Sequence, residues 1–134
     1  MGSVRYLMPI WLILITGLSL APFRVKHHLG ATGMWHTGGH ILVFLITTVL
    51  ICSGAEDKWT RAARTLVVLL FAILCEWLEL AVYGNFRFEW HDVRIDWIGV
   101  ALGFVVASVA HQLAGAKKRV VVGPEGFEPS TKGL

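Results

Sequence analysis

The chain has 134 residues, of which 55% are hydrophobic and 16% are charged, and its mean hydropathy is +0.64. The apolar residues form long blocks instead of thin amphipathic stripes, which argues against a soluble globular core. The blocks also lack sustained alternation of apolar and polar residues, which argues against a membrane β-barrel. The formal charge of +3 comes from basic residues at the block ends with no basic face interleaved with aromatics, so no nucleic-acid partner is expected.

The apolar blocks predict an all-α fold, an integral membrane four-helix bundle. We expect spans at about residues 4–21, 39–54, 62–83 and 93–116. Each is close to the roughly 20 residues that cross about 30 Å of hydrocarbon, although the second is short. Helices are the expected form because they satisfy every backbone polar group within one segment.

The first block has features of a secretory signal peptide. It combines Arg5, an apolar run and small residues at Ser19 and Ala21. Pro22 would follow the cut directly and disfavours cleavage, so we expect an uncleaved first span.

Basic residues near the span ends predict the orientation of the bundle. One side would hold Arg5, Lys58, Arg61, Arg64, Lys117, Lys118 and Arg119, and the other would hold Arg24, Lys26, Arg87 and Arg94. The side with more lysine and arginine residues is expected to be cytoplasmic. Both termini are therefore predicted to be cytoplasmic, with the loops 22–38 and 84–92 facing outward.

Two histidines lie at the outer end of the second span. His36 and His40 are four residues apart and share a helix face if the helix begins by Trp35. They could be interfacial imidazoles that reach water, or they could ligate a metal or transfer a proton. Taken alone, the pair favours the interfacial interpretation.

Two glutamates lie at the outer end of the third span. Glu76 and Glu79 are three residues apart, again on one face. Glu76 is about seven residues inside the end of the span, roughly 10 Å deep. A carboxylate costs roughly 2.5–3.5 kcal/mol near a helix centre, so Glu76 is expected to face the bundle interior. For Glu79, a role in the site and simple surface exposure stay equally open.

The fourth span opens with a stripe of Asp92, Asp96, Gly99 and Gly103, spaced four, three and four residues apart. The glycines form a GxxxG motif, which permits close helix packing. The carboxylates would lie in the first turns, where the helix dipole favours negative charge. An alternative is that Asp92 only caps the helix.

Charged and aromatic residues surround these groups at the predicted outer end. Arg87 and Arg94 are candidate phosphate contacts, and Glu89 is expected on the loop surface. An aromatic belt is predicted at the same level from Trp77, Tyr83, Phe86, Trp90 and Trp97.

The remaining motifs carry little chemistry. Cys52 and Cys75 lie in apolar blocks without CxxC spacing and are predicted to be buried thiols. No nucleotide-binding loop, zinc ribbon or GxSxG elbow is present, and no cofactor is expected.

The last residues differ in composition from the rest. Residues 1–119 are predicted to form the four-span domain, and 120–134, rich in Gly, Pro, Ser and Glu, to be disordered. The string GFEPST matches a translation of the antisense strand of a transfer-RNA T-arm. We hypothesise that this tail is translated read-through, which an overlapping transfer-RNA gene at the 3′ end would establish.

The order and spacing of these polar motifs resemble the VanZ-like family of small bacterial membrane proteins. That family pattern is His-x3-Phe, then Glu-x2-Gln, then an Arg before Asp-x3-Asn-x2-Gly-x3-Gly. The matching positions here are His40, Phe44, Glu76, Asp92, Gly99 and Gly103. The resemblance covers about residues 36–110 and implies a multi-pass protein of the bacterial cytoplasmic (inner) membrane.

Three positions depart from the family pattern. Glu79 stands where the family has Gln and Asp96 where it has Asn, and both add negative charge that favours a cation or a proton at the site. Arg87 is displaced by about one residue from the usual spacing between Arg and Asp, which leaves its role open.

The resemblance implies a role in the cell envelope, because the namesake of the family is associated with low-level resistance to the glycopeptide teicoplanin. The expected polar site at the outer leaflet comprises His40, Glu76, Glu79, Asp92 and Asp96. Its expected partners are membrane lipid and a lipid-linked envelope precursor.

Three further functions are possible beside that one. The alternative is a membrane-embedded, metal-dependent hydrolase of a lipid phosphate, with its ligands among these residues and His36. A proton or ion pathway is disfavoured because the span centres offer little beyond Thr47 and Thr48. A scaffold role, the oligomeric state and the presence of a metal stay open.

Overall fold

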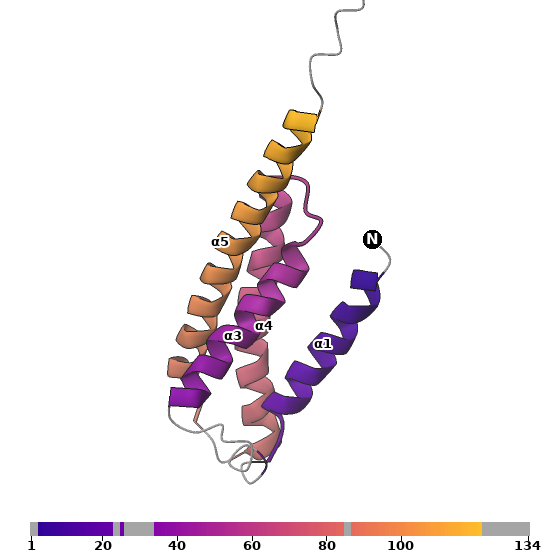
Figure 1. Ribbon diagram of the computed structural model, residues 1–134. Coiled ribbons are helices and arrows are strands. Elements are labelled where there is room, and N and C mark those ends of the chain that lie inside the picture. The colour runs from indigo at the N-terminus through magenta and orange to yellow at the C-terminus, as the bar shows by residue number, and fades with distance from the viewer. Residues whose placement is uncertain (1–2, 23–24, 26–33, 85–86, 122–134) are drawn as a thin grey trace, which may run out of the picture.

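The computed structural model describes residues 3–22, 25, 34–84 and 87–121. Within these ranges the regular structure is entirely helical. The four long helices are α1 (Ser3–Ser19), α3 (Met34–Cys52), α4 (Lys58–Tyr83) and α5 (Trp90–Val121), shown in Figure 1. The predicted all-α, four-helix architecture is confirmed.

Three of these helices are long and apolar enough to cross a membrane: α3, α4 and the Trp90–Ala116 part of α5. Their outward faces carry large apolar side chains. On α4, for example, Val67 is 59% exposed and Leu70 is 57% exposed. A continuous apolar exterior of this kind matches a lipid environment, which makes this a membrane protein. α1 is shorter, at 17 residues, and is not among these three candidate spans.

The helices of the second and third predicted spans begin earlier than expected. α3 starts at Met34 instead of residue 39, because Gly38 and Gly39 are accommodated within the helix. α4 starts at Lys58 instead of residue 62, because Asp57 caps it. The Asp57 carboxylate accepts hydrogen bonds from the backbone N–H groups of Trp59 (2.8 Å) and Thr60 (2.9 Å).

The last helix is longer than expected at both ends. α5 begins at Trp90 instead of residue 93 and continues to Val121, five residues past the predicted end at 116. Residues 120 and 121, assigned to the disordered tail, are therefore helical. The remainder of the predicted tail, 122–134, lies outside the described residues.

The closest helix packing is between α3 and α5, and glycines make it possible. A Cβ atom added at Gly99 would lie 2.5 Å from the carbonyl oxygen of Ile41, and one at Gly103 would lie 2.6 Å from that of Leu45. Both distances are far below van der Waals contact. The two backbones can approach this closely only because these α5 positions have no side chain.

A small apolar core joins α3, α4 and α5. It contains Phe44, Val68, Ala72 and Val100, each at most 3% exposed. The two cysteines, Cys52 and Cys75, are free and buried, as predicted.

α1 lies to the side of this three-helix unit and is held by two polar contacts (Figure 1). The indole Nε1 of Trp11 donates to Thr47 Oγ1 at 2.9 Å. Tyr83 Oη, at the end of α4, donates to the carbonyl oxygen of Leu20 at 2.7 Å. These contacts attach α1 to α3 and the residue that directly follows α1 to α4.

Successive helices run in alternating directions, so the helix bundle has two ends that carry different helix starts and loops. The starts of α3 and α5 lie together at one end (Figure 1). The start of α1, the α3–α4 loop and the last turns of α5 lie at the opposite end. The polar residues at the starts of α3 and α5 are thus brought side by side, although more than fifty residues separate them in sequence.

Candidate functional site

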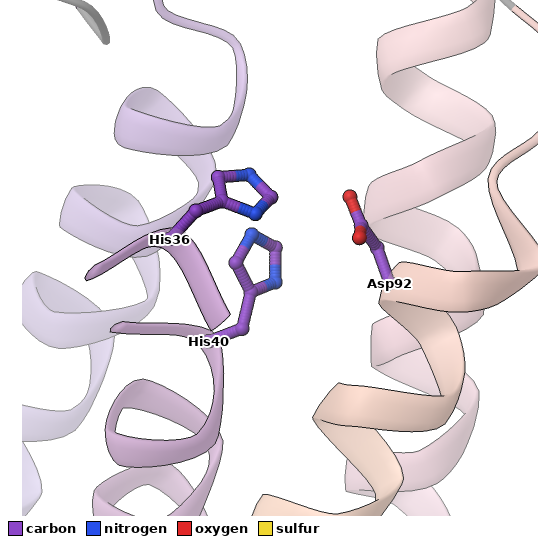
Figure 2. Close-up of side chains that lie close together, drawn as sticks. All are labelled: His36, His40 and Asp92. Atoms are coloured by element: carbon purple, nitrogen blue, oxygen red, sulfur yellow. The ribbon is translucent and has the colours of Figure 1, made fainter. Parts of the chain in front are cut away.

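The first part of the site is a pair of histidines on α3. Because α3 begins at Met34, His36 and His40 both lie on helix and share one face. Their ring centroids are 4.4 Å apart. Figure 2 shows both rings turned toward the gap between α3 and α5.

Asp92 faces this pair from the first turn of α5 (Figure 2). One ligand atom from each of His36, His40 and Asp92 can be chosen so that all three lie within 4.8 Å of one another. All three side chains are partly exposed, so the cluster is reachable from outside the bundle. Asp92 also lies two residues after the helix start, where the helix dipole stabilises a negative charge.

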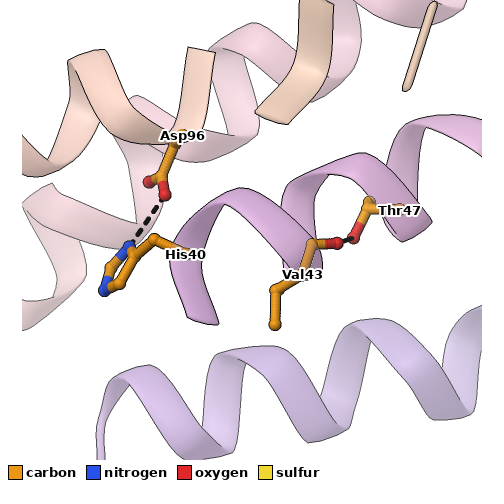
Figure 3. A network of polar contacts seen from close by, with 4 residues as sticks. All are labelled: His40, Val43, Thr47 and Asp96. Carbon is orange, nitrogen blue, oxygen red and sulfur yellow. Dashed lines mark hydrogen bonds and ion pairs between the residues drawn. The ribbon is translucent and has the colours of Figure 1, made fainter. Parts of the chain in front are cut away.

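Asp96, one turn further into α5, pairs with one of the two histidines. Its Oδ1 lies 2.8 Å from Nδ1 of His40 (Figure 3). Asp96 is only 4% exposed, whereas the His40 side chain is 32% exposed. When Asp96 is ionised its carboxylate can only accept, so His40 donates through Nδ1, and a neutral His40 then has its lone pair on Nε2.

Beyond His40, the hydroxyl groups of the two buried threonines of α3 donate to carbonyl oxygens of their own helix. Thr47 and Thr48 are fully buried. Thr47 Oγ1 donates to the carbonyl oxygen of Val43 at 2.7 Å (Figure 3), and Thr48 Oγ1 donates to that of Phe44 at 2.8 Å. The polar site is therefore confined to one end of the α3–α5 pair.

Glu76, on α4, is hydrogen-bonded to the segment that precedes α5. Its Oε1 accepts a hydrogen bond from the backbone N–H of Glu89 at 2.7 Å, which ties α4 to the residue that precedes α5. The place of Glu76 in the polar site with His40 and Asp92 stays a prediction, because the potential ligand cluster consists of α3 and α5 residues only. Glu79 is partly buried on the same helix.

The residues around the mouth of the site are exposed and rich in charge and aromatic rings. Arg87, Glu89 and Arg94 are all exposed. Phe88 packs edge-on against Trp77 and Trp90, with ring centroids 6.4 and 4.8 Å away. The arginines are therefore available to an anion at this end, beside an aromatic ledge.

Sequence reasoning left His36 out of the expected polar site and kept it only as a candidate ligand of the alternative hydrolase. It included Asp96 in the site as a charged variant of an amide position. The structure joins both to His40. The spacing of His36 and His40 was a usable signal that depended on where α3 begins. The pairing of His40 with Asp96 had no such signal, because it depends on the register between two helices.

The arrangement can hold a cation between its imidazoles and carboxylates. Its combination of a buried carboxylate and a histidine at the end of two apolar helices is unusual for a purely structural contact. No family model matches the chain, and no curated protein or solved structure matches it.

Proposed function

We propose that this chain is a VanZ-like, multi-pass protein of the bacterial cytoplasmic (inner) membrane that acts on the cell envelope. Its site at the outer leaflet would engage the phosphate of a membrane lipid or of a lipid-linked envelope precursor, and thereby modulate glycopeptide susceptibility. The observation that carries the proposal is the 2.8 Å pair between His40 and the buried Asp96. A desolvated charge of this kind at a membrane helix end is expensive, so a functional role is the default interpretation.

The surroundings of the pair support a phosphate-bearing ligand. Arg87 and Arg94 are exposed at the same end, and guanidinium groups pair with phosphate in a bidentate manner. Trp77 and Trp90 are 59% and 57% exposed, as expected of aromatic residues at a membrane interface. A lipid could therefore place its headgroup near the arginines while its chains lie along the apolar faces.

The proposal is tested by comparing glycopeptide susceptibility among bacterial cells that express variants at matched protein levels. His40→Ala and Asp92→Ala are expected to abolish the difference between cells with and without the protein. Arg87→Ala with Arg94→Ala is expected to weaken it. His91→Ala is the matched control, because His91 is exposed beside Asp92 and lies outside the ligand cluster. Unchanged susceptibility for both His40→Ala and Asp92→Ala would contradict the proposal.

The alternative function is metal-dependent hydrolysis of a lipid phosphate. The specific observation in its favour is the convergence of His36, His40 and Asp92, which are residue types that bind catalytic metals. Release of inorganic phosphate from a lipid phosphate by purified protein, dependent on an added divalent ion, would favour hydrolysis over binding alone.

A further inference from the structure

We propose that His36, His40 and Asp92 bind one zinc-type transition-metal ion, and that Asp96 is the positioning residue for His40. This inference deepens the proposed function, because it names a ligand of the same polar site. It does not depend on the envelope role, since metal binding is measured separately from susceptibility.

The first argument is geometric. The three potential ligand atoms already lie within 4.8 Å of one another. Zinc bonds of about 2.0–2.1 Å in a tetrahedral site place ligand atoms roughly 3.3 Å apart, so closure requires shifts of about 1.5 Å or less. Side-chain rotation can supply this, because His36 and Asp92 are partly exposed and lie at the first turns of their helices.

The second argument is the hydrogen bond that holds His40. A histidine that ligates a metal through one ring nitrogen almost always donates the other N–H to a carboxylate or carbonyl, which sets its tautomer and orientation. Asp96 Oδ1 takes this position, 2.8 Å from His40 Nδ1. A neutral His40 that donates through Nδ1 has on Nε2 the lone pair that a metal requires, on a ring whose orientation is set by a buried carboxylate.

The third argument is the donor set. Two histidines at positions i and i+4 on one helix face are a known arrangement for zinc, and a carboxylate from another segment completes three protein ligands. Three ligands leave one position for water or for a phosphate oxygen. Two imidazoles favour zinc and related ions over Mg²⁺, which prefers oxygen ligands.

Charge balance supports the same assignment. The site brings two carboxylates, Asp92 and Asp96, to the end of two apolar helices. A divalent cation held by neutral imidazoles would neutralise both negative charges. The cost of placing these carboxylates at a membrane boundary is thereby reduced.

The test uses the purified full-length chain, without an affinity tag that binds metal, in detergent micelles. Zn²⁺ is titrated by calorimetry, and Co²⁺ is used as a spectroscopic substitute that reports tetrahedral geometry. We expect one Zn²⁺ per chain with no competition from Mg²⁺. His36→Ala and Asp92→Ala each remove a ligand and should weaken Zn²⁺ binding at least about 100-fold. Mutation of residues that only hydrogen-bond to metal ligands already weakens metal binding about 10–100-fold, and loss of a ligand should cost more.

Asp96→Asn separates positioning from ligation. We expect it to weaken Zn²⁺ binding about 10–100-fold while the stoichiometry stays at one and the Co²⁺ spectrum remains tetrahedral. His91→Ala should bind Zn²⁺ as the wild type does. If Asp96→Asn fails to fold, His36→Ala still tests the site, because His36 is partly exposed and outside the apolar core.

Two outcomes would overturn the inference: no stoichiometric Zn²⁺ binding by the wild type, or equal binding by the wild type and His36→Ala. The result is independent of the envelope proposal. Zinc binding by the wild type, with unchanged susceptibility for both His40→Ala and Asp92→Ala, would support the metal site and contradict the envelope role. Absence of zinc binding, with susceptibility changed by both variants, would contradict the metal site and support the envelope role.

Discussion

At the scale of single residues, the carboxylates at the ends of the helices have separate roles. Asp96 is buried against His40, Glu76 accepts a backbone hydrogen bond from Glu89, and Asp57 caps α4. Three carboxylates thus have three functions: one orients an imidazole, one holds the α4–α5 loop, and one caps the start of a helix. Which role each adopts depends on the donor that the neighbouring segment places beside it.

The cap at Asp57 predicts a pH dependence of stability. Hydrogen bonds from the Thr60 hydroxyl and backbone hold the pKa of Asp57 below its ordinary value of 3.8. A depressed pKa in the folded state means that the cap stabilises fully above pH 3.8, and that this contribution is lost as the pH falls through the lower, folded-state pKa. Asp57→Asn should retain a cap but lose this dependence, whereas Asp57→Ala should lose both.

Thermal unfolding in detergent between neutral pH and about pH 3, the range around an ordinary aspartate pKa, measures this effect. Glu56→Gln is the control, because Glu56 is also exposed in the α3–α4 loop but is not the capping residue. An Asp57→Asn protein with the same acid-dependent loss of stability as the wild type would rule out the cap as its source.

At the scale of helices, the approach of α5 to α3 decides the geometry of the site. Gly99 and Gly103 let the α5 backbone lie against the carbonyl groups of Ile41 and Leu45. Asp96 and Asp92 lie about one and two turns before Gly99 on the same face of α5. The close approach therefore sets the distance between His40 and Asp96.

Gly103→Ala is expected to destabilise the protein by about 1–3 kcal/mol, because the added methyl would overlap backbone atoms that cannot move independently. Gly115→Ala is the matched control on the same helix, since nothing lies within 4 Å of its added Cβ. It should be neutral or stabilising by roughly 0.5–1 kcal/mol through helix propensity. Unfolding in mixed micelles gives both values, and equal effects would show that the close approach is absent.

At the scale of the whole molecule, the alternating helices separate a polar end from a basic end. The site lies where α3 and α5 begin (Figure 1), whereas Lys58, Arg61 and Arg64 lie at the start of α4. The positive-inside rule then predicts that the site faces outward and the start of α4 faces the cytoplasm.

Single cysteines test this orientation. Glu89→Cys should react with a membrane-impermeant maleimide in intact bacterial cells, and Glu56→Cys should react only after the membrane is opened. Both positions are exposed, and the native Cys52 and Cys75 are buried, so background labelling should be low. The reverse labelling pattern would place the site at the cytoplasmic leaflet and contradict the proposed contact with outer-leaflet lipid.

Much of the fold was predictable from the sequence because it follows from local pattern. Long apolar blocks predicted the all-helical architecture, and the spacing of Asp92, Asp96, Gly99 and Gly103 placed them on one helix stripe. Helix boundaries were less predictable. The starts at Met34 and Lys58 depend on a helix that tolerates two adjacent glycines and on a cap at Asp57.

The sequence by itself determined that this is a helical membrane protein with costly polar residues near helix ends, because hydropathy and helical period are properties of short segments. Only the tertiary structure decided which of those residues meet. It paired Asp96 with His40, brought Asp92 to His36, and turned Glu76 to the backbone of Glu89. The physical reason is that a contact between helices depends on their register and separation, which here follow from backbone packing at two glycines.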